Sequence, residues 1–149
     1  MAADTSLAPR IDRLIEHFNQ RSLDLPDGLF DRRTQFLLNG APFETLLGRS
    51  PADPLILMLA RGPAGYRFSV KALQHAIPDA RIERGELAVD GARTSCRLWL
   101  SGVLRGSGHP LDTVIAVTLI RAAAGHVETV EATMEDGALG LIRSARQQP

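Results

Sequence analysis

The start of the chain carries apolar side chains at helical spacing, with polar residues between them. The predicted helix opens with Ser6 as its N-cap and Pro9 in its first turn. Its apolar positions recur every three or four residues, at Ile11, Leu14, Ile15 and Phe18. A single apolar stripe of this kind is buried against another layer, so the sequence predicts a helix that packs on a sheet.

The second half of the chain alternates apolar and polar residues in the manner of strands. Turn signals interrupt the alternation at Asp90-Gly91, at residues 106–110 and at residues 123–125. The predicted strands cover residues 80–89, 93–104, 112–122 and 126–135. Because strands joined by short turns usually pair with their sequence neighbours, we expect an antiparallel meander.

Shorter elements are predicted between these two parts. Residues 25–33, with Pro26 near their start, are typical of a short second helix or a turn. Residues 34–38 and 43–47 flank a four-residue connection, 39–42, and predict a hairpin. Ser50, Pro51 and Asp53 have the order of a helix start, so we expect a helix that runs to Ala60 and stops at Gly62.

Residues 66–76 fit two patterns. Tyr66, Phe68 and Val70 alternate like a strand, whereas Tyr66, Val70, Leu73 and Ile77 step like a helix, and we favour the helix. Beyond Asp136 a few large apolar residues stand among small and polar ones. That composition predicts a short helix or a partly disordered tail.

Length, charge and cysteine content narrow the classes of function. The 149 residues fit one domain, residues 1–149. Seventeen basic residues balance seventeen acidic ones, so no net field attracts nucleic acid or an anionic membrane. Cys96 is the only cysteine, which excludes an intrachain disulfide and favours the cytoplasm. The chain shows no signal peptide and no apolar run of the ~18 residues that span a bilayer.

Several short motifs occur in a recognisable order: Pro78-Asp79, Asp90-Gly91, Ser101-Gly102, Gly106, and Ile120-Arg121 with Gly125, His126 and Val127. In this order and spacing the chain, from about Leu7 to Asp136, resembles the SnoaL-like branch of the nuclear-transport-factor-2-like superfamily. The resemblance implies an α+β cone, in which a curved antiparallel sheet packs on N-terminal helices around an internal pocket. Proteins of the superfamily that the chain resembles include cyclases, isomerases, dehydratases, epoxide hydrolases and binding modules alike. The resemblance therefore does not settle the function.

Two positions depart from the pattern of that family. SnoaL-like proteins often carry an Asp two residues before the pair matched by Ile120-Arg121, and this chain has Thr118 there. The aromatic residue usual in the long strand falls one position later, at Trp99. It then lies on the opposite face of the strand unless a bulge intervenes. Trp99 is therefore either a pocket wall or an interface residue.

A carboxylate inside an apolar cone has its pKa raised by desolvation and can exchange protons near neutral pH. Glu131, between Val130 and Ala132 in the last strand, is the candidate catalytic base. No two histidines stand four residues apart, and none lies near Cys96 in sequence, so we expect no metal and no cofactor. The expected substrate-binding residues are Leu14, Phe18, Phe36, Met58, Tyr66, Trp99 and Thr118.

Two hypotheses for the function follow. In the first, the protein is a cofactor-independent isomerase, cyclase or dehydratase that acts on a small apolar or aromatic molecule, with Glu131 as the base. In the alternative, favoured by Thr118, it is a non-catalytic ligand-binding or interaction module. Residues 114–120 are apolar on both alternating faces, so one face requires a helix and the other a partner subunit, and we expect a homodimer.

Overall fold

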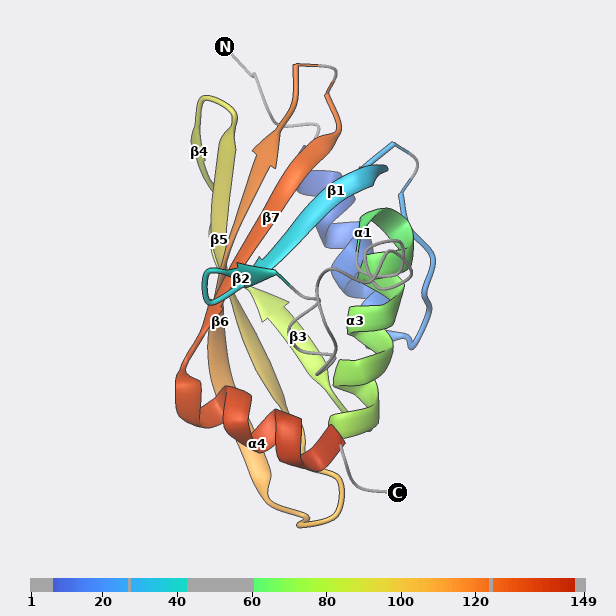
Figure 1. Ribbon diagram of the computed structural model, residues 1–149, viewed down its shortest axis with the longest axis vertical. Coiled ribbons are helices and arrows are strands. Elements are labelled where there is room, and N and C mark those ends of the chain that lie inside the picture. Colours follow the sequence, from blue (N-terminus) through green and yellow to red (C-terminus); the bar gives the residue numbers. More distant parts are fainter. Residues whose placement is uncertain (1–6, 27, 43–60, 124, 147–149) are drawn as a thin grey trace.

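The computed structural model describes residues 7–26, 28–42, 61–123 and 125–146, and these residues form three helices and seven strands (Figure 1). The helices are α1 (Leu7–Asn19), α3 (Gly62–Ala76) and α4 (Asp136–Arg146). The predicted helix at 50–60 and the predicted strand at 43–47 lie outside the described residues. Gly62, expected to stop that helix, is the first residue of α3. The strands are β1 (Phe30–Leu38), β2 (Ala41–Pro42), β3 (Arg81–Arg84), β4 (Ala88–Asp90), β5 (Arg93–Val103), β6 (Pro110–Arg121) and β7 (Val127–Met134).

The seven strands form one curved, open sheet, so the predicted α+β class is confirmed. Its order is β2-β1-β7-β6-β5-β3, and β4 pairs with another part of β5. Strands β3, β5, β6 and β7 pair antiparallel in sequence order, which confirms the meander. β1 departs from the expected pattern because it runs parallel to β7.

Strand β1 begins earlier than predicted. Residues 30–33 are strand, so the prediction of a short helix or turn over residues 25–33 is wrong for their second half. Two hydrogen bonds fix this pairing: Val127 N–H donates to the Leu29 carbonyl at 2.8 Å, and the Thr34 hydroxyl donates to the Val127 carbonyl at 2.6 Å. The bond from Thr34 joins residues 93 positions apart, a pairing that no local pattern in the sequence signals.

The predicted hairpin has a tighter turn than expected. Asn39 and Gly40 alone form the turn, with φ of 52° and 80°, the left-handed conformations that a two-residue hairpin turn requires. Ala41 and Pro42, expected in the connection, pair with the end of β1 as strand β2.

The strand predicted at 80–89 is two strands. β3 ends at Arg84, β4 begins at Ala88, and Gly85 lies in the break between them. The Trp99 ring lies so close to Gly85 that a Cβ at this glycine would be 3.1 Å from the ring. The close approach of the ring explains why a glycine stands at the break.

Helices α1 and α3 lie on the inner face of the sheet, and α4 crosses one end of the molecule (Figure 1). α1 is the predicted first helix, and it buries Leu7, Ile11 and Phe18. The ambiguous segment 66–76 is helical and lies within α3. The tail is helix α4 up to Arg146, with Ala138, Ile142 and Ala145 buried. None of the described helices is long and apolar enough to cross a membrane.

Candidate functional site

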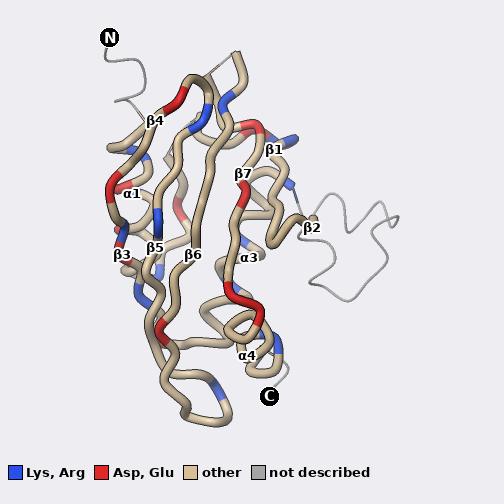
Figure 2. Tube along the Cα trace, turned by 90° about the vertical axis from the view of Figure 1, so that its left-hand side faces the viewer, with Lys and Arg blue, Asp and Glu red and all other residues tan. Residues whose placement is uncertain are grey.

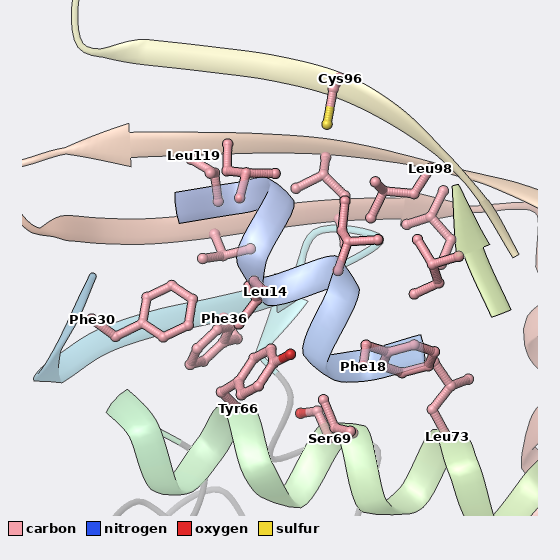
Figure 3. A pocket seen from close by; sticks show the side chains of 18 residues that line it. Leu14, Phe18, Phe30, Phe36, Tyr66, Ser69, Leu73, Cys96, Leu98 and Leu119 are labelled. Carbon is pink, nitrogen blue, oxygen red and sulfur yellow. The ribbon is translucent and has the colours of Figure 1, made fainter. Parts of the chain in front are cut away.

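A cavity of about 210 Å³ lies between the inner face of the sheet and helices α1 and α3 (Figure 3). Its wall consists of inward-facing residues of the strands, since alternate side chains of a strand point to opposite faces, together with the facing sides of the two helices. The lining residues are Ile11, Leu14, Ile15 and Phe18 of α1, Phe30 and Phe36 of β1, Tyr66, Ser69, Val70 and Leu73 of α3, and Ile82, Cys96, Leu98, Ile115, Val117, Leu119, Val130 and Ala132 of the remaining strands.

Three of these residues bring a side-chain oxygen or sulfur to the cavity. The hydroxyl groups of Tyr66 and Ser69 project from neighbouring turns of α3, and the sulfur of Cys96 points in from β5 on the opposite side (Figure 3). The Ser69 hydroxyl donates to the Gly65 carbonyl at 2.9 Å, so its proton is already used. The other described residues of the lining have hydrocarbon side chains.

Tyr66 is held within a group of aromatic rings. Its ring centroid lies 5.6 Å from that of Phe30, which in turn contacts Phe36 edge to face at 5.4 Å. Burial raises the pKa of Tyr66 well above its ordinary value of 10.0. The phenol therefore keeps its proton and offers a hydrogen-bond donor, and it has no hydrogen-bond partner among the described residues.

Cys96 is a thiol in this environment. Burial raises the pKa of the Cys96 thiol above its ordinary value of 9.0, and the Arg84 guanidinium offsets part of that rise. Since the thiolate is the nucleophilic form of cysteine, this side chain is a soft apolar wall and a weak donor.

A bidentate ion pair fixes α1 to the edge of the sheet. Arg84 of β3 donates from Nε to Oδ1 of Asp12 and from Nη2 to Oδ2 of Asp12, the second bond measuring 3.0 Å. These hydrogen bonds hold the pKa of the Asp12 carboxyl below its ordinary value of 3.8. Asp12 is adjacent to Ile11, which lines the cavity, so the ion pair holds that part of α1 in position against the sheet.

Four of the residues predicted to bind a substrate line the cavity: Leu14, Phe18, Phe36 and Tyr66. They come from α1, β1 and α3. Met58, which was also expected to bind a substrate, lies outside the described residues.

Trp99, Thr118 and Glu131 lie on the outer face of the sheet instead. Their strand neighbours Leu98, Val117 and Val130 line the cavity, so their own side chains point the other way. The Thr118 hydroxyl lies 3.1 Å from that of Ser95, which is on the same outer face. The expected placement of Thr118 in the pocket is therefore wrong. For Trp99, which was also expected to bind a substrate, the outer face agrees with the second of the two alternatives that its position left open.

Glu131 is not positioned to act as the base predicted for the cavity. Its side chain is 43 % exposed and lies 4.0 Å from Arg93. A bulge explains the error: Arg121 pairs with Val127 and Ile120 pairs with Thr129, so one extra residue interrupts the alternation of β7. Val127 is buried on the inner side, whereas Glu131, an even number of positions later, faces outward.

The sequence reasoning missed several lining residues. Ser69 and Cys96 were not among the expected substrate-binding residues, yet both line the cavity. The missed strand residues Ile115, Val117 and Leu119 share one parity of β6. Both faces of that strand are apolar in sequence, so periodicity alone did not distinguish the cavity side.

Known structures share the architecture described above. A SnoaL-like polyketide cyclase from Agrobacterium tumefaciens superposes with a TM-score of 0.64 at 19% identity, covering 90% of this chain and 94% of that chain. TsrD from Streptomyces laurentii superposes with a TM-score of 0.69 at 15% identity, covering 95% and 97%. The chain has a SnoaL-like fold. At these identities the likeness shows the SnoaL-like fold alone. No protein-family model matches the sequence, and no curated protein matches it significantly.

Proposed function

We propose that this SnoaL-like protein binds a small apolar or aromatic molecule in the cavity between α1, α3 and the sheet, without catalysing a reaction on it. The observation that carries the proposal is that the described lining residues have hydrocarbon side chains except for Tyr66, Ser69 and Cys96. An apolar cavity of about 150 Å³ is enough to bind benzene. The cavity of about 210 Å³ is therefore of the right size for one ring system with small substituents.

Proton-transfer chemistry has less support. A general base must lie within hydrogen-bond reach of the proton that it removes, and its pKa must suit the working pH. Among the described residues that line the cavity there is no carboxylate and no histidine. The two acidic groups that do line it, the Tyr66 phenol and the Cys96 thiol, both have raised pKa values and keep their protons. The A. tumefaciens protein is a polyketide cyclase, but a shared fold does not transfer its activity.

The test is a thermal-unfolding screen with small ketones, phenols, terpenes and alkylbenzenes, because a ligand that binds only the folded state raises its stability. Val117→Phe fills the cavity from β6, and it should abolish any ligand-induced rise in melting temperature. Val114→Phe places the same ring on the outer face of the same strand, and it should leave the rise intact. Absence of stabilisation by every compound, or equal stabilisation of wild type and Val117→Phe, would contradict the proposal.

We also propose that a second copy of this chain covers the outer face of the sheet. Trp99 and Val114 are paired there across β5 and β6, and they are 43% and 39% exposed. β6 is uncharged over its middle part, between the basic residues of β5 and the acidic residues of β7 (Figure 2). A two-fold axis along β6 would set Arg97 of each copy on the side of the partner's β7, which carries Glu131, so the face is complementary to itself.

Light scattering at micromolar concentration tests the dimer. The expected mass is twice 16.1 kDa. Val114→Arg should reduce it to the monomer mass, whereas Val89→Arg, at a residue on β4 that is 50% exposed, should not. A monomeric wild type would rule out this arrangement and leave the cavity unaffected.

A further inference from the structure

The cavity has one polar end, and its two hydroxyl groups have different hydrogen-bonding capacity. Tyr66 and Ser69 stand three residues apart on α3, so they occupy one face of the helix. The Ser69 hydroxyl donates its hydrogen bond to the Gly65 carbonyl, so it presents only its lone pairs to the cavity. Tyr66 presents a free O–H, since no described residue accepts from it.

An unpaired hydroxyl in such a lining is energetically unfavourable. A donor that is desolvated without an acceptor carries a free-energy penalty relative to one that is satisfied. The neighbouring side chains Phe30, Phe36 and Leu14 are hydrocarbon and cannot accept its proton (Figure 3). A ligand that places an oxygen atom at this point removes the penalty, whereas a pure hydrocarbon leaves it in place.

The other walls limit the ligand further. The lining residues of β5 and β6 are Cys96, Leu98, Ile115, Val117 and Leu119, and the thiol is only a weak donor. Cys96, Leu98 and Leu119 lie across the cavity from Tyr66 (Figure 3). Among the described lining residues there is no Arg, Lys, Asp, Glu or His to balance a charge. A carboxylate or an amine would have to be desolvated without a partner, so a charged ligand is strongly disfavoured.

We infer that the ligand is a neutral molecule that is hydrocarbon over most of its surface and carries one oxygen acceptor, which receives a hydrogen bond from the Tyr66 hydroxyl. The inference rests on the proposed binding function. Tyr66 is then the residue that determines specificity, and the aromatic and aliphatic walls contact the hydrocarbon part of the ligand.

The test uses two probes with the same carbon skeleton: camphor, and its analogue in which an exocyclic methylene group replaces the carbonyl oxygen. Dissociation constants are measured by calorimetry for wild type, Tyr66→Phe and the control variant Ser101→Ala, at an exposed residue of β5 that does not line the cavity. Tyr66→Phe removes only the hydroxyl and keeps the ring against Phe30. A net hydrogen bond of about 1 kcal/mol corresponds to roughly fivefold in affinity. Tyr66→Phe should therefore weaken camphor binding about fivefold and leave the methylene analogue unchanged or bound more tightly.

A second readout addresses the same contact directly. Tyr66 is the only tyrosine in the chain, so the tyrosine absorption band reports this one hydroxyl. Camphor should shift the band, as a phenol that donates to a carbonyl does, and the methylene analogue should not. Ser101→Ala, which removes an exposed hydroxyl of β5 outside the cavity lining, serves as the control variant, and it should preserve both the shift and the preference for camphor.

The outcomes separate this inference from the proposed function. If both probes bind the wild type and Tyr66→Phe alters their affinities equally, the assignment of Tyr66 is overturned and the cavity remains a binding site. If neither probe binds and no compound of the thermal screen binds either, the proposed function fails together with the inference. If benzoate binds as tightly as the neutral probes, the exclusion of charged ligands, and with it the inference, is overturned.

Discussion

Asn19 and Ile82 exchange two hydrogen bonds, one in each direction. The Asn19 side-chain amide donates from Nδ2 to the Ile82 carbonyl at 2.9 Å, and its Oδ1 accepts from the Ile82 N–H at 2.9 Å. The side chain at the end of α1 thus pairs with the edge strand β3 as the backbone of another strand would. Together with the Asp12–Arg84 pair, this contact holds the helix that carries Leu14 and Phe18 against the sheet.

Replacing Asn19 with alanine should destabilise the fold by about 1–3 kcal/mol, since it leaves both backbone groups of Ile82 without their partner. Urea unfolding measures this change. Gln20→Ala, at the adjacent exposed position, should change the free energy of unfolding by less than about 0.5 kcal/mol. If the two substitutions changed the free energy of unfolding equally, the two hydrogen bonds between Asn19 and Ile82 would contribute nothing to stability.

Alanine substitutions at Gly62 and Gly91 form a matched pair that tests the contact between the start of α3 and β1. Gly62 is the first residue of α3, and Gly91 lies in the turn between β4 and β5. Their φ values, 63° and 59°, are almost equal, so alanine at either position meets a similar backbone penalty of about 1–2 kcal/mol. At Gly62, however, a Cβ would lie 2.6 Å from the Arg32 Cα of β1, whereas at Gly91 it would meet nothing within 4 Å. Gly62→Ala should cost clearly more than Gly91→Ala in chemical denaturation, and similar costs would contradict the close contact of α3 with β1.

Thr34 and Thr94 are both buried strand residues, with 0% and 2% of their surface exposed. The Thr34 hydroxyl donates to the Val127 carbonyl and accepts from the Asp31 N–H, whereas that of Thr94 has no partner among the described residues. Valine has nearly the same shape as threonine. Thr34→Val should therefore destabilise by about 1–3 kcal/mol, and Thr94→Val should stabilise by about 1 kcal/mol. A loss of stability in Thr94→Val would indicate a hydrogen bond that this geometry does not contain.

Cys96 should react slowly with a disulfide reagent such as Ellman's, and more slowly still when the cavity is filled. Burial raises the pKa of this thiol, which reduces the thiolate fraction, and a bound molecule would also block access. The rate is followed by absorbance, with the urea-unfolded protein as the reference. A folded-state rate equal to the unfolded one, or no protection by a ligand that stabilises the protein, would contradict this placement of the thiol.

Local patterns in the sequence were sufficient for the elements whose partners are close in the chain. The apolar stripe of α1 and the turn at Asp90-Gly91 predicted the first helix and the meander, and both are present. β1 was missed at its start because its partner Val127 is distant in sequence and residues 31–33 are polar. The parallel pairing of β1 with β7 comes from tertiary contacts and has no local signal.

For the candidate site, too, the sequence predicted what depends on local spacing and missed what depends on a distant strand. Leu14 and Phe18 belong to the apolar stripe that predicted the first helix, and both line the cavity. Glu131 was placed wrongly because a single extra residue after Val127 reverses the parity of the rest of β7. A bulge of this kind depends on the neighbouring strand and leaves no mark in the alternation of one strand.

Tyr66 gives the last prediction, a loss of stability at high pH. Its phenol is neutral in both the folded and the unfolded chain below pH 10.0, so it contributes no pH dependence there. Above that value the unfolded chain loses the proton while the buried phenol keeps it, because burial raises the folded pKa. The unfolded state is then favoured, and stability falls with rising pH by up to about 1.4 kcal/mol per pH unit until the folded pKa is reached.

Urea unfolding of wild type and Tyr66→Phe at several pH values above 10.0 isolates this effect, since all other titrating groups are common to both proteins. The stability of wild type should fall relative to that of Tyr66→Phe as the pH increases, and absorbance of the single tyrosine should show its ionisation delayed in the folded state. Parallel pH profiles for the two proteins, or a tyrosine that ionises at its ordinary pKa while the protein remains folded, would show that the hydroxyl is in contact with solvent. The cavity would then lack the enclosed donor on which the selection of an oxygen-bearing ligand depends.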